Sequence, residues 1–402
     1  MATNFLLFDI DSVLIDPRGY RKAVYDTTRY FLDTLGLTNI SINEDVITTF
    51  ESIGITSEWD MIPLYLLSVI DQVLSKFNLQ PEIGNSQNSF RFTQPKNYFL
   101  RQEELIDQIL SYKEFLQEGY SVIESILLLN FRQNSVEIFR DVRTKVPWLI
   151  NNWFAESRNI QQSEILQYFQ NLALGSDLFH DITGLDPFLE SEPYLMRHDL
   201  PLIKPENVDK IRSFAAKSNV FQAVITARPS AFPAGVPLKK SQLNFPEAEL
   251  ALKCLELDQI KCIGFGALEY LGELNNQSGD QFVKPSPIHA MTALLVSSGV
   301  EVTDALNFSY KYIKQKQHVE VVNHFSRFES PINLCIFEDS TIGIQSLARV
   351  CESLRSDGLE IKLLAYGIST NQNKIDALKK ENAIIFPTIN EAFSACVDFL
   401  KI

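Results

Sequence analysis

The chain has 402 residues, of which 45% are hydrophobic and 21% are charged, and its formal net charge at pH 7 is −14. These values are ordinary for a globular protein and exclude a disordered or collagen-like chain. The negative charge disfavours non-specific attraction to nucleic acid and to anionic membranes, so we expect a small-molecule partner and neither of those two. Since single cores seldom exceed roughly 250–300 residues, two domains are expected.

The cysteines and the apolar segments indicate a cellular compartment. Five cysteines occur with no CxxC pair, so the sequence signals neither a disulfide framework nor a thiolate zinc site. The chain start lacks a basic segment followed by a long apolar one, and no apolar run approaches the ~20 residues that a membrane helix needs. We therefore expect a cytoplasmic protein that is neither exported nor inserted in a membrane. The oligomeric state cannot be read from the sequence.

The first sixteen residues predict a buried strand that ends in two acids, because four apolar residues run into Asp9 and Asp11 in the segment FLLFDIDSVLID. A long region with apolar residues three and four positions apart follows, which is typical of helices. This spacing predicts helices over 21–35, 61–77, 102–112 and 163–174, with no convincing strand between them. The segment Leu79–Asn97 is rich in Pro, Gly, Asn, Ser and Gln and predicts a long exposed loop.

From about residue 200, short apolar strands alternate with helical patterns. The strands are expected at 221–226, 260–265, 334–338, 361–366 and 383–386. This alternation indicates a parallel sheet with helices on both faces, and the opening strand has the same character. We therefore predict an α/β fold with a Rossmann-like core formed by residues 1–16 and 200–402, and a large all-α domain, residues 17–199, inserted after the first strand.

Polar residues that carry chemistry follow several of these strands, and open parallel sheets bind ligands outside the carboxyl ends of their strands. The residues expected there are Asp9, Asp11, Thr226, Glu338 and Asp339, with Lys284 just before a helix. One of the two neighbouring acids would serve as a nucleophile and the other would transfer a proton. Acids crowded in this way need a counter-charge, which a hard cation such as Mg²⁺ supplies.

Four segments in this order resemble the motifs of the haloacid dehalogenase-like superfamily of phosphotransferases. They are DIDSV (residues 9–13), VIT (224–226), KPSP (284–287) and FEDSTIGIQS (337–346). The resemblance covers the expected α/β core, and the insertion point matches that of helical caps in subfamily I. It implies a subfamily IA-like hydrolase with a large helical cap.

The resemblance also implies roles for individual residues and a function. Asp9 would be the nucleophile and Asp11 the general acid and base, while Thr226 and Lys284 would hold the phosphoryl oxygens. Mg²⁺ would bind Asp9, the backbone carbonyl of Asp11, Asp339 and, directly or through water, Glu338. The implied function is a Mg²⁺-dependent phosphatase that hydrolyses a small phosphorylated metabolite through an aspartyl-phosphate. A β-phosphoglucomutase-like phosphomutase and a catalytically silent binding protein of this fold remain open.

The sequence departs from the family pattern at two positions. Ser12 replaces a glycine, and Gly343 stands where an acid is often found. The segment 302–331 is an insertion with no role assigned from the sequence.

The segments TARPS (226–230) and GITSEWD (54–60) are similar to an uncharacterised branch of subfamily IA, which makes Arg228, Trp59 and Asp60 candidates for the substrate pocket. Simpler interpretations stay open: packing for Trp59, a salt bridge for Arg228, a helix N-cap for Thr226, and a solvated side chain for Lys284. The five histidines show no metal-ligand spacing and are interpreted as structural or surface residues.

Overall fold

The computed structural model describes residues 2–77, 82, 83, 90–92, 100–116, 122, 125, 126, 138–150, 154, 157–236 and 245–402. The chain divides into two compact units. The described residues of the first, which we call the sheet unit, are 2–18, 198–236 and 245–402, and those of the second, the helical unit, lie between Gly19 and Arg197. The sequence placed these boundaries after residue 16 and before residue 200.

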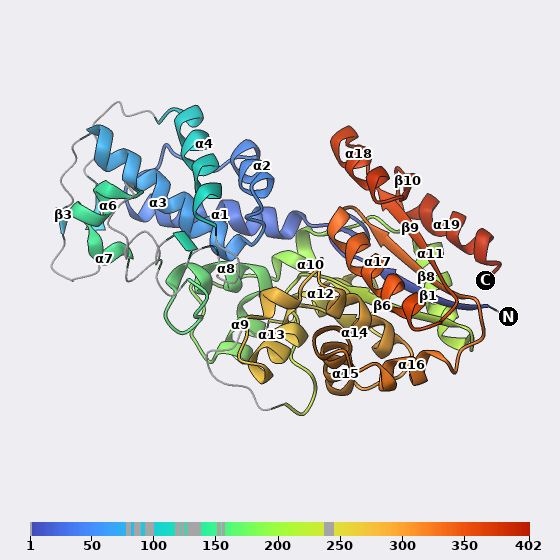
Figure 1. The fold of residues 1–402 in the computed structure, drawn as a ribbon. Helices are drawn as coiled ribbons and strands as arrows, with labels where there is room; N and C mark the ends of the chain where they lie inside the picture. Colours follow the sequence, from blue (N-terminus) through green and yellow to red (C-terminus); the bar gives the residue numbers. More distant parts are fainter. Residues whose placement is uncertain are drawn as a thin grey trace. The chain divides into compact units, whose positions relative to one another are not determined.

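The sheet unit contains six parallel strands in the order β10-β9-β8-β1-β6-β7 (Figure 1). Their bounds are β1 Thr3–Phe8, β6 Val220–Ile225, β7 Lys261–Ile263, β8 Ile332–Glu338, β9 Ile361–Ile368 and β10 Ile384–Phe386. The first strand of the chain therefore lies at the centre of the sheet, between strands that follow it by more than 200 residues. The predicted α/β class with a Rossmann-like parallel sheet is confirmed.

Side chains alternate between two buried faces of the sheet, as expected for a strand covered on both sides. In β1, Phe5 and Leu7 point into one core, whereas Leu6 and Phe8 point into the other. Helices α13 Phe265–Leu274, α14 Pro287–Ser297 and α17 Thr341–Ser356 cover the first face. Helices α11 Pro205–Ser213, α12 Glu247–Cys254 and α19 Ile389–Leu400 cover the second. The remaining elements of this unit are α18 Gln372–Lys380 and the 3₁₀ helices η3 Phe214–Ala216 and η4 Gly279–Phe282.

The segment 302–331 adds two helices to the first face. They are α15 Val302–Gln315 and α16 Val319–Phe325, and α15 packs against α14. Leu306, Tyr312 and Phe325 are buried in the same core as Phe5 and Leu7. The insertion is thus part of the hydrophobic core.

The register of the central strands sets the position of the candidate site. Phe8, the last residue of β1, lies opposite Val224 of β6 and Phe337 of β8. The backbone N–H of Asp9 still donates to the carbonyl of Phe337 at 3.1 Å. The residues that follow all three strands therefore meet at one edge of the sheet.

A tight turn follows β1. Ser12 adopts a left-handed conformation with φ of 61°, and its N–H donates to the carbonyl of Ile15 at 2.7 Å. Glycine reaches this region at lower cost, so the serine found here accepts some backbone strain. The turn leads into β2 Ile15–Asp16, which pairs antiparallel with β5 Leu200–Pro201. The two segments at which the chain leaves and re-enters the sheet unit are thus hydrogen-bonded to each other.

The described part of the helical unit is mostly α-helical, as predicted. Its elements are α1 Arg18–Thr34, α2 Glu44–Ser52, α3 Glu58–Phe77, α4 Gln102–Ser111, η1 Tyr112–Phe115, α6 Arg140–Lys145, α7 Pro147–Leu149, α8 Glu164–Leu174, α9 Ser176–Thr183 and α10 Tyr194–His198. The expectation of no strand here was wrong in one place, because β3 Glu82–Ile83 pairs with β4 Phe90–Arg91.

The predicted loop Leu79–Asn97 lies outside the described residues, apart from β3, β4 and Phe92. Among the helices that the structure describes, none is long and apolar enough to cross a membrane.

Candidate active site

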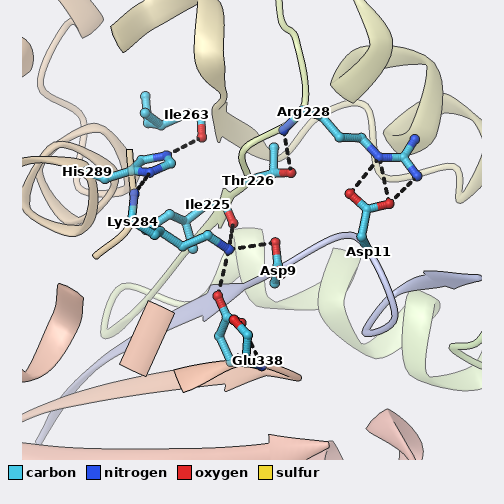
Figure 2. Close-up of polar contacts among 10 residues, drawn as sticks. Asp9, Asp11, Ile225, Thr226, Arg228, Ile263, Lys284, His289 and Glu338 are labelled. Atoms are coloured by element: carbon cyan, nitrogen blue, oxygen red, sulfur yellow. Dashed lines mark hydrogen bonds and ion pairs between the residues drawn. The ribbon is translucent and has the colours of Figure 1, made fainter. Parts of the chain in front are cut away.

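Lys284 connects the ends of the two central strands. Its Nζ atom lies 2.9 Å from Oδ1 of Asp9 and 2.6 Å from Oε1 of Glu338 (Figure 2). It also lies 3.4 Å from the carbonyl oxygen of Ile225 at the end of β6. The Lys284 side chain is only 3% exposed, so the interpretation as a solvated lysine is wrong. The structure brings together Asp9, Lys284 and Glu338, three of the residues selected from the sequence.

Burial and neighbouring charges shift the pKa values of Asp9 and Lys284. Burial, and after it the negative charge of Glu338, raises the pKa of Asp9 well above its usual value, and the ammonium of Lys284 only partly opposes this. Burial alone would lower the pKa of Lys284, but the carboxylates of Asp9 and Glu338 outweigh burial and raise it. Lys284 is therefore a permanent positive charge between two buried acids.

Three carboxylates form a set that fits a metal ion. Asp9, Glu338 and Asp339 each offer one oxygen, and these oxygens lie within 4.8 Å of one another. Hard oxygen donors with several negative charges are what Mg²⁺ requires. Glu338 is held in place by Ser340, whose hydroxyl donates to Oε2 at 2.8 Å. Lys374, in the first turn of α18, lies 2.5 Å from Oδ2 of Asp339.

Gly343 explains one of the two departures from the family pattern. A Cβ atom at this position would lie 1.8 Å from Oε1 of Glu338, far inside van der Waals contact. Glu338 is fully buried and lies against the first turn of α17. Any side chain at position 343 would displace this carboxylate, so the glycine leaves the space that Glu338 occupies.

Asp11 belongs to a second cluster of charges. Its two oxygens accept hydrogen bonds from Nε of Arg228, both at 3.0 Å, and Oδ1 also accepts one from Nη2 at 2.6 Å. The same guanidinium contacts Oδ2 of Asp199 at 3.2 Å. Figure 2 shows Asp11 facing Arg228, whereas Asp9 faces Lys284. The two acids that end the first strand therefore have different cationic partners.

Thr226 lies between these clusters at the end of β6. Its side chain is fully buried, and its hydroxyl oxygen accepts the backbone N–H of Arg228 at 3.1 Å. Residues 227–236 form no helix, so the N-cap interpretation of Thr226 was wrong. The hydroxyl instead stabilises the turn that follows β6, because it accepts a backbone N–H two residues further along the chain.

Three residues of the site were not selected from the sequence: Asp199, Lys374 and His289. His289 accepts the backbone N–H of Lys284 on Nδ1 at 3.2 Å, and its Nε2–H donates to the carbonyl of Ile263 at 2.9 Å. Burial, followed by the charge of Lys284, lowers the pKa of His289 to about 3, so the ring is neutral. The only sequence feature that links His289 to the site is its position five residues after the lysine of KPSP, and this spacing is a weak signal.

Trp59 and Asp60 lie on α3 of the helical unit and are buried. The carboxylate of Asp60 forms an ion pair with Arg158, with Oδ2 and Nη2 2.6 Å apart. This ion pair is enough to explain why the charged side chain of Asp60 is buried. A role of Trp59 and Asp60 in the substrate pocket stays a prediction.

Solved structures similar to the chain were found. An X-ray structure of a Northeast Structural Genomics Consortium target is 14% identical with a TM-score of 0.58, and the match covers 100% of both chains. A phosphatase from Thermococcus thioreducens is 14% identical with a TM-score of 0.44, over 93% of this chain and 99% of that one. A hydrolase from Pseudomonas syringae is 10% identical with a TM-score of 0.32, over 98% of each chain.

No family model and no curated protein sequence matches the chain. The first of these solved structures shows that the fold has a precedent along the whole chain. The resemblance to the haloacid dehalogenase-like superfamily rests on the four motifs, three of which place their polar residues in the cluster around Lys284 and Asp9.

Proposed function

We propose that the protein is a Mg²⁺-dependent phosphomonoesterase that transfers the phosphoryl group of a small metabolite to Asp9. The observation that carries this proposal is the position of Asp9. It is a buried carboxylate at the end of the central strand, 2.9 Å from a buried lysine and within 4.8 Å of two further carboxylates.

Five free cysteines, three of them buried, support a reducing, cytoplasmic setting.

The residues account for both steps of the reaction. A carboxylate oxygen of Asp9 attacks phosphorus, the bond from phosphorus to the ester oxygen breaks, and that oxygen takes a proton from Asp11. A water molecule then gives a proton to Asp11 and attacks the same phosphorus, which releases phosphate and restores Asp9. Lys284 holds phosphoryl oxygens and offsets the charge of the buried acids throughout.

The carboxylates of Asp9, Asp339 and Glu338, with the carbonyl of Asp11, would hold the metal. Bound there, Mg²⁺ supplies positive charge that makes it easier for an anionic nucleophile to approach an anionic phosphate. Lys284 alone cannot supply that charge, because it is already shared between Asp9 and Glu338.

Phosphate release from a panel of phosphorylated metabolites, with Mg²⁺ or with EDTA, tests the proposal. We expect release that stops in EDTA and returns with Mg²⁺. Conversion of a sugar monophosphate that needs a bisphosphate activator and gives no net phosphate would indicate the phosphomutase. Binding of these compounds without turnover would indicate the silent binding protein.

The variant Asp9→Asn tests the nucleophile. An amide has the shape of the carboxylate but cannot form an acyl-phosphate, so turnover is expected to fall by at least about a thousandfold. Circular dichroism should show an unchanged fold. Near-normal turnover of this variant would rule out the covalent mechanism.

A further inference from the structure

The guanidinium of Arg228 lies between two carboxylates, Asp11 and Asp199 (Figure 2 shows the contact with Asp11). Toward Asp11 it presents Nε and Nη2, which contact both carboxylate oxygens at 2.6–3.0 Å. Toward Asp199 it presents Nη1 and Nη2, each 3.2 Å from Oδ2. Arginine forms such planar, forked contacts because its donors have a fixed geometry, which a lysine does not offer.

The two carboxylates differ in exposure. The side chains of Arg228 and Asp199 are 1% and 0% exposed, whereas that of Asp11 is 36% exposed. Separating a buried ion pair leaves an uncompensated charge and is strongly unfavourable. Arg228 therefore remains paired with Asp199, and Asp11 is the partner that is accessible to solvent.

The backbone around this cluster is also fixed. The backbone N–H of Arg228 donates to the hydroxyl oxygen of Thr226. The backbone carbonyl of Arg228 accepts the N–H of Phe265 at 2.9 Å. Asp199 directly precedes β5, and β5 pairs with β2, a few residues after Asp11. Backbone hydrogen bonds thus tie together the two segments that carry the acids.

We propose that Asp199 and Arg228 are positioning residues for Asp11, the proton-transfer group of the reaction proposed above, on which this inference rests. Asp199 fixes the guanidinium, and the guanidinium fixes both oxygens of Asp11 beside the nucleophile. Arg228 is then not a residue that contacts the substrate, which is the role for which the sequence made it a candidate.

The test is a cycle of variants that leaves no buried charge unpaired. The double variant Asp199→Asn/Arg228→Gln removes both charges of the buried pair, and it is made in the wild-type and in the Asp11→Asn backgrounds. In the wild-type background we expect the double variant to lower kcat at least about tenfold, because a well-placed proton-transfer group raises the rate by roughly 10²–10⁴-fold. KM and the inhibition constant of inorganic phosphate should stay within about twofold. In the Asp11→Asn background the same change should leave the residual kcat unaltered.

Two results would overturn the inference. An equal loss of kcat in both backgrounds would show that the pair does not act through Asp11. A tenfold weaker inhibition by inorganic phosphate would make Arg228 a phosphate ligand. A third variant, Arg228→Lys, keeps the charge without the fork and should be as slow as the double variant, so full activity would contradict positioning by the fork.

Controls separate this inference from the proposed function and from misfolding. Thermal unfolding identifies variants that fail to fold. Arg212→Gln/Glu256→Gln removes an exposed ion pair of the same unit and should leave kcat unchanged. If Asp9→Asn is inactive but the double variant lowers kcat by the same factor in both backgrounds, only the positioning inference is wrong. If Asp9→Asn stays active, the proposed function itself falls.

Discussion

The carboxylates of Asp9 and Asp11 are one residue apart in sequence, yet they lie in two different electrostatic environments. Asp9 is buried and paired with a lysine, whereas Asp11 is partly exposed and paired with an arginine. A lysine ammonium is a compact charge that serves acids from several directions, and Lys284 contacts groups at the ends of β1, β6 and β8. The guanidinium of Arg228 instead holds Asp11 by both carboxylate oxygens, while it also contacts one oxygen of Asp199.

This difference matches the two roles proposed. A nucleophile needs nearby positive charge that a phosphoryl group can share, and a proton-transfer group needs a fixed position with access to the leaving oxygen. The turn from Ile10 to Ser12 separates the two side chains after the strand ends, so one short motif supplies both environments. Three predictions test how far the Lys284 cluster determines stability and metal binding.

The largest effect is expected from removing the buried lysine. Lys284→Met leaves the carboxylates of Asp9 and Glu338 without their shared cation, which should lower the free energy of unfolding by about 3–5 kcal/mol. Urea denaturation at pH 7 measures it. Lys374→Met is the matched control, because it removes a lysine from the same cluster that is 53% exposed and should change stability by less than about 1 kcal/mol. Equal losses in the two variants would contradict the difference in burial.

An intermediate effect is expected from His289 as the pH falls. Its pKa is lowered to about 3 in the folded protein by burial and by Lys284, against 6.5 as the ordinary value. The unfolded chain therefore takes up a proton below pH 6.5 while the folded protein does not, and stability is lost as the pH falls from 6.5 toward 3. Between pH 7 and 5 the wild type should lose about 2 kcal/mol more than His289→Gln, since each pH unit is worth about 1.4 kcal/mol.

Chemical denaturation of both proteins across this pH range measures the difference. Parallel stability curves for the wild type and His289→Gln would show that the ring is not held neutral in the folded protein.

The smallest effect is expected at Lys374. Its ammonium lies against Asp339, a proposed metal ligand, and repels a cation bound there. Lys374→Gln should therefore tighten Mg²⁺ binding by about three- to tenfold, which corresponds to about 1 kcal/mol of screened repulsion. Calorimetric titration with Mg²⁺ in the absence of substrate measures this. Lys379→Gln, at the other end of α18, should leave the affinity unchanged, and weaker binding by Lys374→Gln would mean that the lysine orients Asp339 instead.

Local sequence patterns are enough to predict the fold class and most of the residues at the sheet edge. Apolar runs separated by helical patterns indicate a parallel sheet, because strands buried on both faces need continuous apolar side chains. The polar residues after β1, β6 and β8 were identified because parallel strands bring their carboxyl ends to the same edge. These signals are local, so they can be read along the chain.

Which charges pair with one another depends on the three-dimensional fold. Arg228 and Asp11 are 217 residues apart, and Lys284 and Glu338 are 54 apart, so no sequence spacing specifies their contacts. The strand order β8-β1-β6 and its register determine those distances. Asp199, Lys374 and His289 gave no usable signal for the same reason: a lone charged or imidazole side chain acquires its role only from the side chains that folding places within a few ångströms of it.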